Sequence, residues 1–108
     1  MVSDNQKRSR DTTRIIIDPP TFSLPPEMRS GYLERRKGEI GMMLASAGEG
    51  DWKPVVNIAN HVRGTGAMYG FDNIGQAAEE LVKAVQNGDS KSFGYMEAYA
   101  KAVNESYV

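Results

Sequence analysis

Apolar residues recur at intervals of three and four positions through four successive segments of the chain. This spacing places them on one side of an α-helix, and glycine or aspartate residues separate one segment from the next. We therefore expect helices over residues 27–47, 51–69 and 72–86, and a fourth helix from residue 89 or 90 onward. Short turns between amphipathic helices favour antiparallel neighbours, so the predicted fold is an all-α, up-down antiparallel four-helix bundle.

Each expected helix has one apolar face that would form the core. The core-facing residues are Met28, Tyr32, Leu33, Ile40, Met43, Leu44 and Ala47; then Val55, Ile58, Ala59, Val62, Gly66 and Tyr69; then Ile74, Ala77, Ala78, Leu81, Val82 and Val85; and finally Phe93, Met96, Ala100, Val103 and Tyr107. The charged residues Glu34, Arg35, Arg36, Lys37 and Glu39 are expected on the outer face of the first helix.

The residues between the helices predict where each helix begins and ends. The expected N-caps are Asp51, Asp72, and either Asp89 or Ser90. The expected stops are Gly48, Gly70 in a left-handed conformation with Phe71 folding back, and the pair Asn87-Gly88.

The chain before the helices has a different character. Residues 1–13 are polar with no apolar period, so we expect a disordered tail. Residues 14–26 join a β-branched run to four prolines, which disfavour helix, and we expect an extended N-terminal strap. The bundle would then occupy residues 27–108.

Composition excludes several classes of function. The chain has 108 residues, with 13 Lys+Arg against 14 Asp+Glu and a formal net charge of −1, which argues against a nucleic-acid partner. It contains no cysteine and one histidine, so thiolate catalysis and a multi-histidine metal site are excluded. No apolar run reaches the roughly 20 residues of a membrane-spanning helix. We expect a cytoplasmic domain with no membrane partner, no metal and no cofactor.

The second expected helix carries an unusual outward face centred on Gly64. On a helical wheel Gly64 lies almost opposite the core stripe, whereas Gly66 faces the core. The other residues on the outward face are Lys53, Asn57, Asn60, Arg63 and Ala67. A glycine inside a helix costs about 1 kcal/mol relative to alanine. The missing side chain therefore suits a large partner that approaches closely, and the cations suit an acidic or phosphorylated one.

The pattern Val62-Arg63-Gly64-x-Gly66-x-x-Tyr69-Gly70-Phe71 resembles the signature of histidine-containing phosphotransfer (HPt) domains. The likeness extends over about residues 15–103. It implies a four-helix bundle that works in a two-component phosphorelay by docking onto the receiver domain of a response regulator. A hybrid sensor kinase is a further candidate partner. Magnesium would belong to the receiver, and no autonomous enzyme activity is implied for this chain, which we expect to be monomeric.

One position departs from the HPt pattern. Arg63 matches the family's lysine, which neutralises the phosphoryl group, and Gly64 matches the glycine that admits the receiver. The phosphoaccepting histidine of the family would fall at position 60, which is Asn60 here. The only histidine, His61, lies one step further on, about 100° around the helix.

Three interpretations follow. In the favoured one, the module has lost its phosphoacceptor and binds receivers as a regulator. In the second, His61 accepts the phosphoryl group through a local shift of the helix or a rotated docking pose. In the third, the chain is a non-signalling adaptor bundle, in which a partner helix packs against the Gly64 face.

Overall fold

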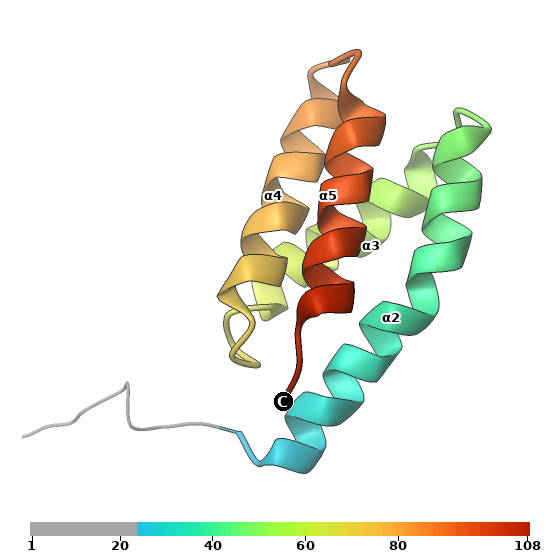
Figure 1. The fold of residues 1–108 in the computed structure, drawn as a ribbon. Coiled ribbons are helices and arrows are strands. Elements are labelled where there is room, and N and C mark those ends of the chain that lie inside the picture. The colour runs from blue at the N-terminus through green and yellow to red at the C-terminus, as the bar shows by residue number, and fades with distance from the viewer. Residues whose placement is uncertain (1–23) are drawn as a thin grey trace, which may run out of the picture.

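The computed structural model describes residues 24–108, which form four α-helices and no strand (Figure 1). The helices are α2 (Pro26–Gly48), α3 (Lys53–Thr65), α4 (Asp72–Gln86) and α5 (Ser92–Glu105). The tail expected over residues 1–13 lies outside the described residues, and so does the strap over 14–26 apart from its last three residues. Of these three, Pro26 is already the first residue of α2 rather than part of a strap.

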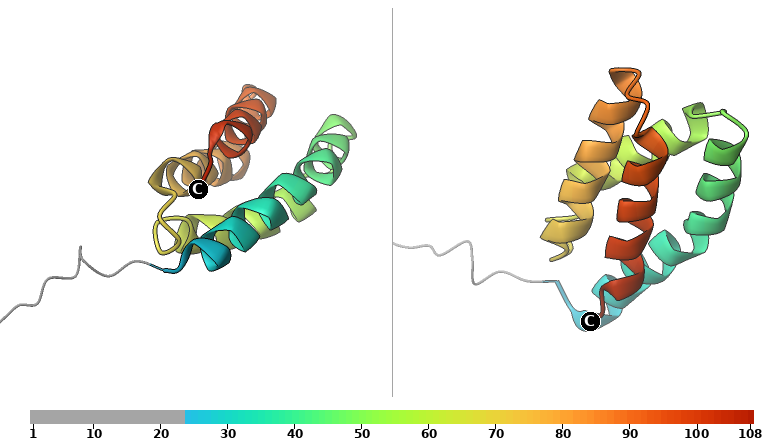
Figure 2. Two further views of the ribbon diagram at one scale, coloured as in Figure 1. Left: turned by 60° about the horizontal axis from the view of Figure 1, so that its bottom comes forward. Right: turned by 45° about the horizontal axis from the view of Figure 1, so that its top comes forward.

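The predicted up-down four-helix bundle is confirmed. In Figure 1, α4 and α5 run side by side in opposite directions, and α3 crosses behind α5 on its way to the start of α4. Figure 2 shows the same arrangement from two further directions, with α2 and α3 on one side of the α4–α5 pair. The main packing partners are α3 with α4, α4 with α5, and α2 with α5. One face of α3 is therefore covered by the bundle and the opposite face is left outside it.

The three turns between the helices share one hydrogen-bonding pattern. Gly50, Gly70 and Gly88 have φ angles of 79°, 87° and 65°. In each turn the glycine amide donates to the carbonyl three residues earlier, and the next amide donates to the carbonyl five residues before it. This is the Schellman motif, in which a left-handed residue satisfies the last carbonyls of a helix. The predictions for Gly70 and Gly88 are confirmed.

Several predicted boundaries are wrong by a few residues. The left-handed stop after α2 is Gly50, because Gly48 still belongs to the helix. The second helix ends at Thr65 rather than at residue 69, since the Tyr69 amide donates to both Thr65 and Gly66 carbonyls in a tighter turn.

The predicted N-caps are also wrong. The residues at the N-cap positions of α3, α4 and α5 are Trp52, Phe71 and Lys91, none with a side-chain capping bond. Asp89 instead accepts a hydrogen bond from the Lys91 amide at 2.8 Å, within the turn that precedes α5.

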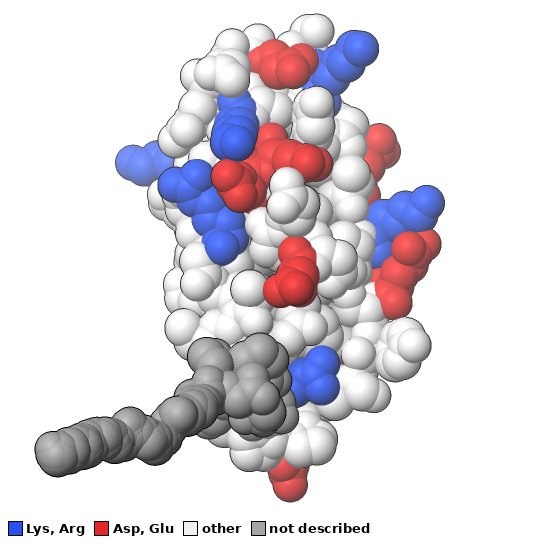
Figure 3. Space-filling view, turned by 90° about the vertical axis from the view of Figure 1, so that its left-hand side faces the viewer, with Lys and Arg blue, Asp and Glu red and all other residues white. Residues whose placement is uncertain are grey.

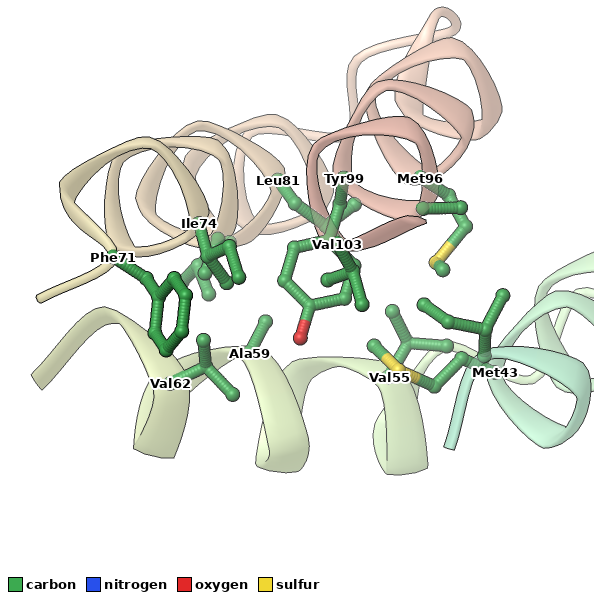
Figure 4. Close-up of a cluster of buried hydrophobic side chains, with 14 of the residues drawn as sticks. Met43, Val55, Ala59, Val62, Phe71, Ile74, Leu81, Met96, Tyr99 and Val103 are labelled. Atoms are coloured by element: carbon green, nitrogen blue, oxygen red, sulfur yellow. The ribbon is translucent and has the colours of Figure 1, made fainter. Parts of the chain in front are cut away.

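The core is built from the predicted apolar stripes of all four helices (Figure 4). The fully buried large side chains are Met43, Val55, Val62, Ile74, Leu81, Val82, Met96, Tyr99 and Val103. Three residues predicted to face the core are exposed instead: Met28 by 49%, Phe93 by 39% and Tyr107 by 83%. Tyr99, which was not among the predicted core residues, takes a central place in α5.

Arg36 corrects the prediction of a charged outer face on α2. Arg36 is only 2% exposed to solvent. Its guanidinium donates from Nε and Nη2 to the two carboxylate oxygens of Glu39, at 2.8 and 2.9 Å, and lies 4.7 Å from the ring centroid of Tyr32. Burial lowers the pKa of Arg36, and the interactions with Glu39 and Tyr32 raise it by more, so the group stays charged inside the protein.

Candidate functional site

The outward face of α3 contains the site residues predicted from the sequence. Lys53, Asn57, Arg63 and Gly64 are exposed on α3, and Asn60 is half-buried between them. The opposite side of the helix is buried through Val55, Ala59 and Val62. Ala67 is also exposed, but it lies in the turn after α3 rather than on the helix. The structure therefore places five of the six residues on one helix face and the sixth just beyond its end.

Two glycines near the end of α3 have different roles. A Cβ atom added at Gly64 would meet nothing within 4 Å, so no packing contact requires a glycine there. A Cβ added at Gly66 would lie 2.7 Å from the backbone nitrogen of Gly75 and 2.8 Å from its Cα. Gly66 thus permits the close approach of α3 and α4, as its predicted core position suggested. Gly64 instead leaves a bare patch of helix open to solvent.

Two side chains from the beginning of α2, Arg29 and Tyr32, hold the end of α3 in place. The rings of Tyr32 and Tyr69 are stacked, with centroids 4.2 Å apart and planes inclined by 11°. Arg29 donates from Nε to the Tyr69 carbonyl at 2.9 Å, and its guanidinium lies 5.2 Å from the ring centroid of Phe71. These contacts join the turn after α3 to the first turns of α2.

A short chain of hydrogen bonds extends the same contact into α3. The Thr65 hydroxyl donates to the His61 carbonyl at 3.0 Å, and Thr65 Oγ1 lies 2.8 Å from the Tyr32 hydroxyl. Because Thr65 has a single hydroxyl proton, Tyr32 is the donor in the second bond. Arg29 and Thr65 were not predicted as supporting residues, since the period of one helix does not show which side chain of another helix each residue meets.

The charged side chains of α3 are all positive. Residues 53–65 include Lys53 and Arg63 but no Asp or Glu. Within residues 24–108, the side chains of Asn60 and Arg63 make no ion pair or side-chain hydrogen bond. Both are therefore available to bind a ligand or a partner.

Carboxylates border this face on the α4 side. A shallow depression between α3 and α4 is lined by Arg63, Ala67, Asp72, Gly75, Gln76 and Glu79. Arg63 thus lies between the bare patch at Gly64 and a neighbouring wall that contains Asp72 and Glu79. Figure 3 shows the molecule from the side where α4 lies, with acidic and basic side chains interspersed rather than gathered into one patch of a single sign.

His61 is exposed on α3, next to Asn60 in the chain. Both residues lie within the α-helix Lys53–Thr65, so the two side chains point about 100° apart. Helix α3 contains no local shift that would bring His61 to the position of Asn60.

Within residues 24–108, no group of three or more His, Cys, Asp or Glu side chains is placed to hold a metal ion. None of the helices in this part of the chain is long and apolar enough to cross a membrane. Comparisons of the chain with protein-family models, curated proteins and solved structures gave no match.

Proposed function

We propose that this chain is an HPt-like module of a two-component phosphorelay that docks onto receiver domains through the outward face of α3. The observation that carries the proposal is the open position at Gly64, which no packing contact explains and which lies beside Asn60 and Arg63 on α3. A helix with no side chain at this point admits a partner surface to its backbone. The partner is the receiver domain of a response regulator, or that of a hybrid sensor kinase, and the module acts as a cytoplasmic monomer.

In this proposal the module does not accept a phosphoryl group. Phosphohistidine forms because a neutral imidazole nitrogen is a usable nucleophile near neutral pH. The amide nitrogen of Asn60 has its lone pair delocalised into the carbonyl and cannot replace it. His61 has a suitable nitrogen but lies about 100° around the helix from Asn60. The chain is therefore a receiver-binding regulator without catalysis of its own.

Each residue of the face has a role in docking. Gly64 permits close approach, Arg63 pairs with the acidic groups of a receiver, and Asn60 offers an amide to the same region. Lys53, Asn57 and Ala67 form the edge of the contact. The α2 residues Arg29 and Tyr32, which hold the end of α3, keep the face in a fixed shape.

The test measures binding to all receiver domains of the source organism. Gly64→Glu should weaken binding at least about tenfold, which is about 1.4 kcal/mol. The matched control is Gly94→Glu, because Gly94 is also an exposed helical glycine with nothing within 4 Å of an added Cβ, but lies on α5. Equal binding by both variants, or no binding to any receiver, would contradict the docking proposal.

Phosphoryl transfer from a bound, labelled receiver tests the role of position 60. The unmodified chain should remain unlabelled, and Asn60→His should gain acid-labile phosphate. Label on the unmodified chain that disappears in His61→Ala would instead support a phosphotransfer protein that uses His61. Binding of a partner that is not a receiver, lost in Gly64→Glu, would favour the adaptor bundle.

A further inference from the structure

Asn60 and Arg63 lie on the same side of Gly64, about 40° and 100° around α3 from it, and within residues 24–108 their side chains have no hydrogen-bond partner. Given the proposed docking onto receivers, we propose that this pair binds an aspartyl phosphate on the partner without covalent reaction. The chain then recognises the phosphorylated state of the receiver and protects it. This inference rests on the proposed function, and it adds which state of the partner is bound and what happens to the phosphoryl group.

The amide of Asn60 is suited to the first contact. Its side chain carries two N–H donors, and it has no side-chain hydrogen-bond partner within residues 24–108. The residue is half-buried, so part of its surface is already removed from water. Its free amide can donate to a phosphoryl oxygen that is brought over the bare backbone at Gly64.

Arg63 supplies the charge. It lies three residues after Asn60, and side chains at this spacing are neighbours, with Cβ atoms about 5–6 Å apart. A guanidinium binds phosphate oxygens through two parallel N–H donors. Because α3 contains no carboxylate, nothing on the helix itself repels an anion at this place.

The negative charge of the ligand decides whether the phosphorylated or the unphosphorylated receiver binds more tightly. A phosphoryl group carries a charge of about −1.5 to −2 near neutral pH, whereas an unmodified aspartate carries one negative charge. The phosphoryl group also extends further from the partner's backbone and offers three acceptor oxygens. Asp72 and Glu79 line the depression on the α4 side of Arg63, so an anion is favoured only on the Asn60 side. The pair therefore favours the phosphorylated partner.

Binding leaves the phosphoryl group where it is. Asn60 provides no nucleophile, so no bond to phosphorus forms and the acyl phosphate stays intact on its aspartate. The group is otherwise lost when water attacks phosphorus. A helix that packs over it through the open position at Gly64 excludes that water, so the bound receiver keeps its phosphoryl group for longer.

The first test compares the affinity of the chain for a docking receiver with and without beryllofluoride, which forms a stable analogue of the aspartyl phosphate. We expect binding at least about tenfold tighter to the beryllofluoride form. Asn60→Asp keeps the shape of the side chain but replaces the donors with a negative charge, and it should abolish or invert this preference. Arg63→Ala should reduce the preference to below about threefold, while Lys101→Ala, which removes an exposed cation from α5, should leave it unchanged.

The second test measures the lifetime of the labelled phosphoryl group on the receiver. Saturating amounts of the chain should lengthen its half-life, and Asn60→His should shorten it as label moves to the chain. Equal affinity for both receiver forms, or a half-life that the chain does not lengthen, would overturn this inference while leaving the docking proposal intact. The failure of docking is recognised separately, by Gly64→Glu binding as well as Gly94→Glu or by no receiver binding at all.

Discussion

The substitution of Gly66 by alanine should destabilise the bundle, and the same substitution at Gly64 should stabilise it. The Cβ added at position 66 would lie 2.7 Å from the nitrogen of Gly75, about 0.7 Å short of the 3.4 Å at which ordinary contact begins. It would also lie 3.1 Å from the Phe71 carbonyl oxygen. These neighbours are backbone atoms and cannot rotate away, so the end of α3 and the beginning of α4 must separate.

The magnitudes follow from the two environments. Overpacking a tightly packed site typically costs about 1–3 kcal/mol. At position 64 the added methyl meets nothing, and the better helix propensity of alanine contributes about 0.8–1 kcal/mol. The two variants should therefore differ by about 2–4 kcal/mol in the free energy of unfolding, although they carry the same chemical change two residues apart.

Urea unfolding followed by far-ultraviolet circular dichroism measures this difference. The unmodified chain should lie between the two variants, with equal slopes for all three proteins if the unfolded states are alike. A Gly66→Ala variant as stable as Gly64→Ala would refute the close approach of α3 and α4 on which the reasoning depends.

Three further variants test other parts of the structure. Tyr99→Phe should raise the free energy of unfolding by about 1 kcal/mol, because the buried Tyr99 hydroxyl has no hydrogen-bond partner within residues 24–108. A lower melting temperature of Tyr99→Phe in thermal unfolding would contradict this. Burial raises the pKa of Tyr99, so the unfolded chain loses this proton first; stability should decline above about pH 10 in the unmodified chain and decline less in Tyr99→Phe. Glu39→Gln should destabilise by about 1–3 kcal/mol, since it leaves the buried Arg36 without its carboxylate, whereas Glu34→Gln on the exposed side of α2 should have little effect in the same urea assay. Gly70→Ala should cost about 1–2 kcal/mol, because φ at Gly70 is 87° and the added Cβ would lie 3.0 Å from the Arg29 side chain; an unchanged melting temperature would contradict this.

The helices and most of the core could be predicted from sequence, because burial of one face imposes a period of three to four residues that is visible locally. The same helical period predicted that Gly64 lies on the outward face of α3. The close approach of Gly66 to Gly75 could not be predicted in this way, since it depends on which residue of α4 lies opposite. The same reason explains why the bond between Tyr32 and Thr65 was not anticipated.

The prediction for Arg36 was wrong because it followed the charge of the side chain. The helical period of the apolar residues in α2 indicated the correct face. Arg36 lies four residues after Tyr32 and four before Ile40, which is a core position in the stripe of α2. The charge of its side chain suggested the opposite face. The planar guanidinium packs over the ring of Tyr32, and Glu39 on the same helix supplies the counter-charge, so the register of the helix decides the outcome.

The Schellman turns at Gly50, Gly70 and Gly88 bear on the order in which the chain folds. The entropic cost of closing a loop grows with its length, so α3 with α4 and α4 with α5 can pair early as local hairpins. The main packing partner of α2 is α5, at the other end of the chain, so we expect α2 to dock after the two hairpins have formed. Because Arg29 and Tyr32 belong to α2, their contacts with Tyr69 and Thr65 form only when α2 docks. We therefore expect the face around Gly64 to acquire its final shape late in folding.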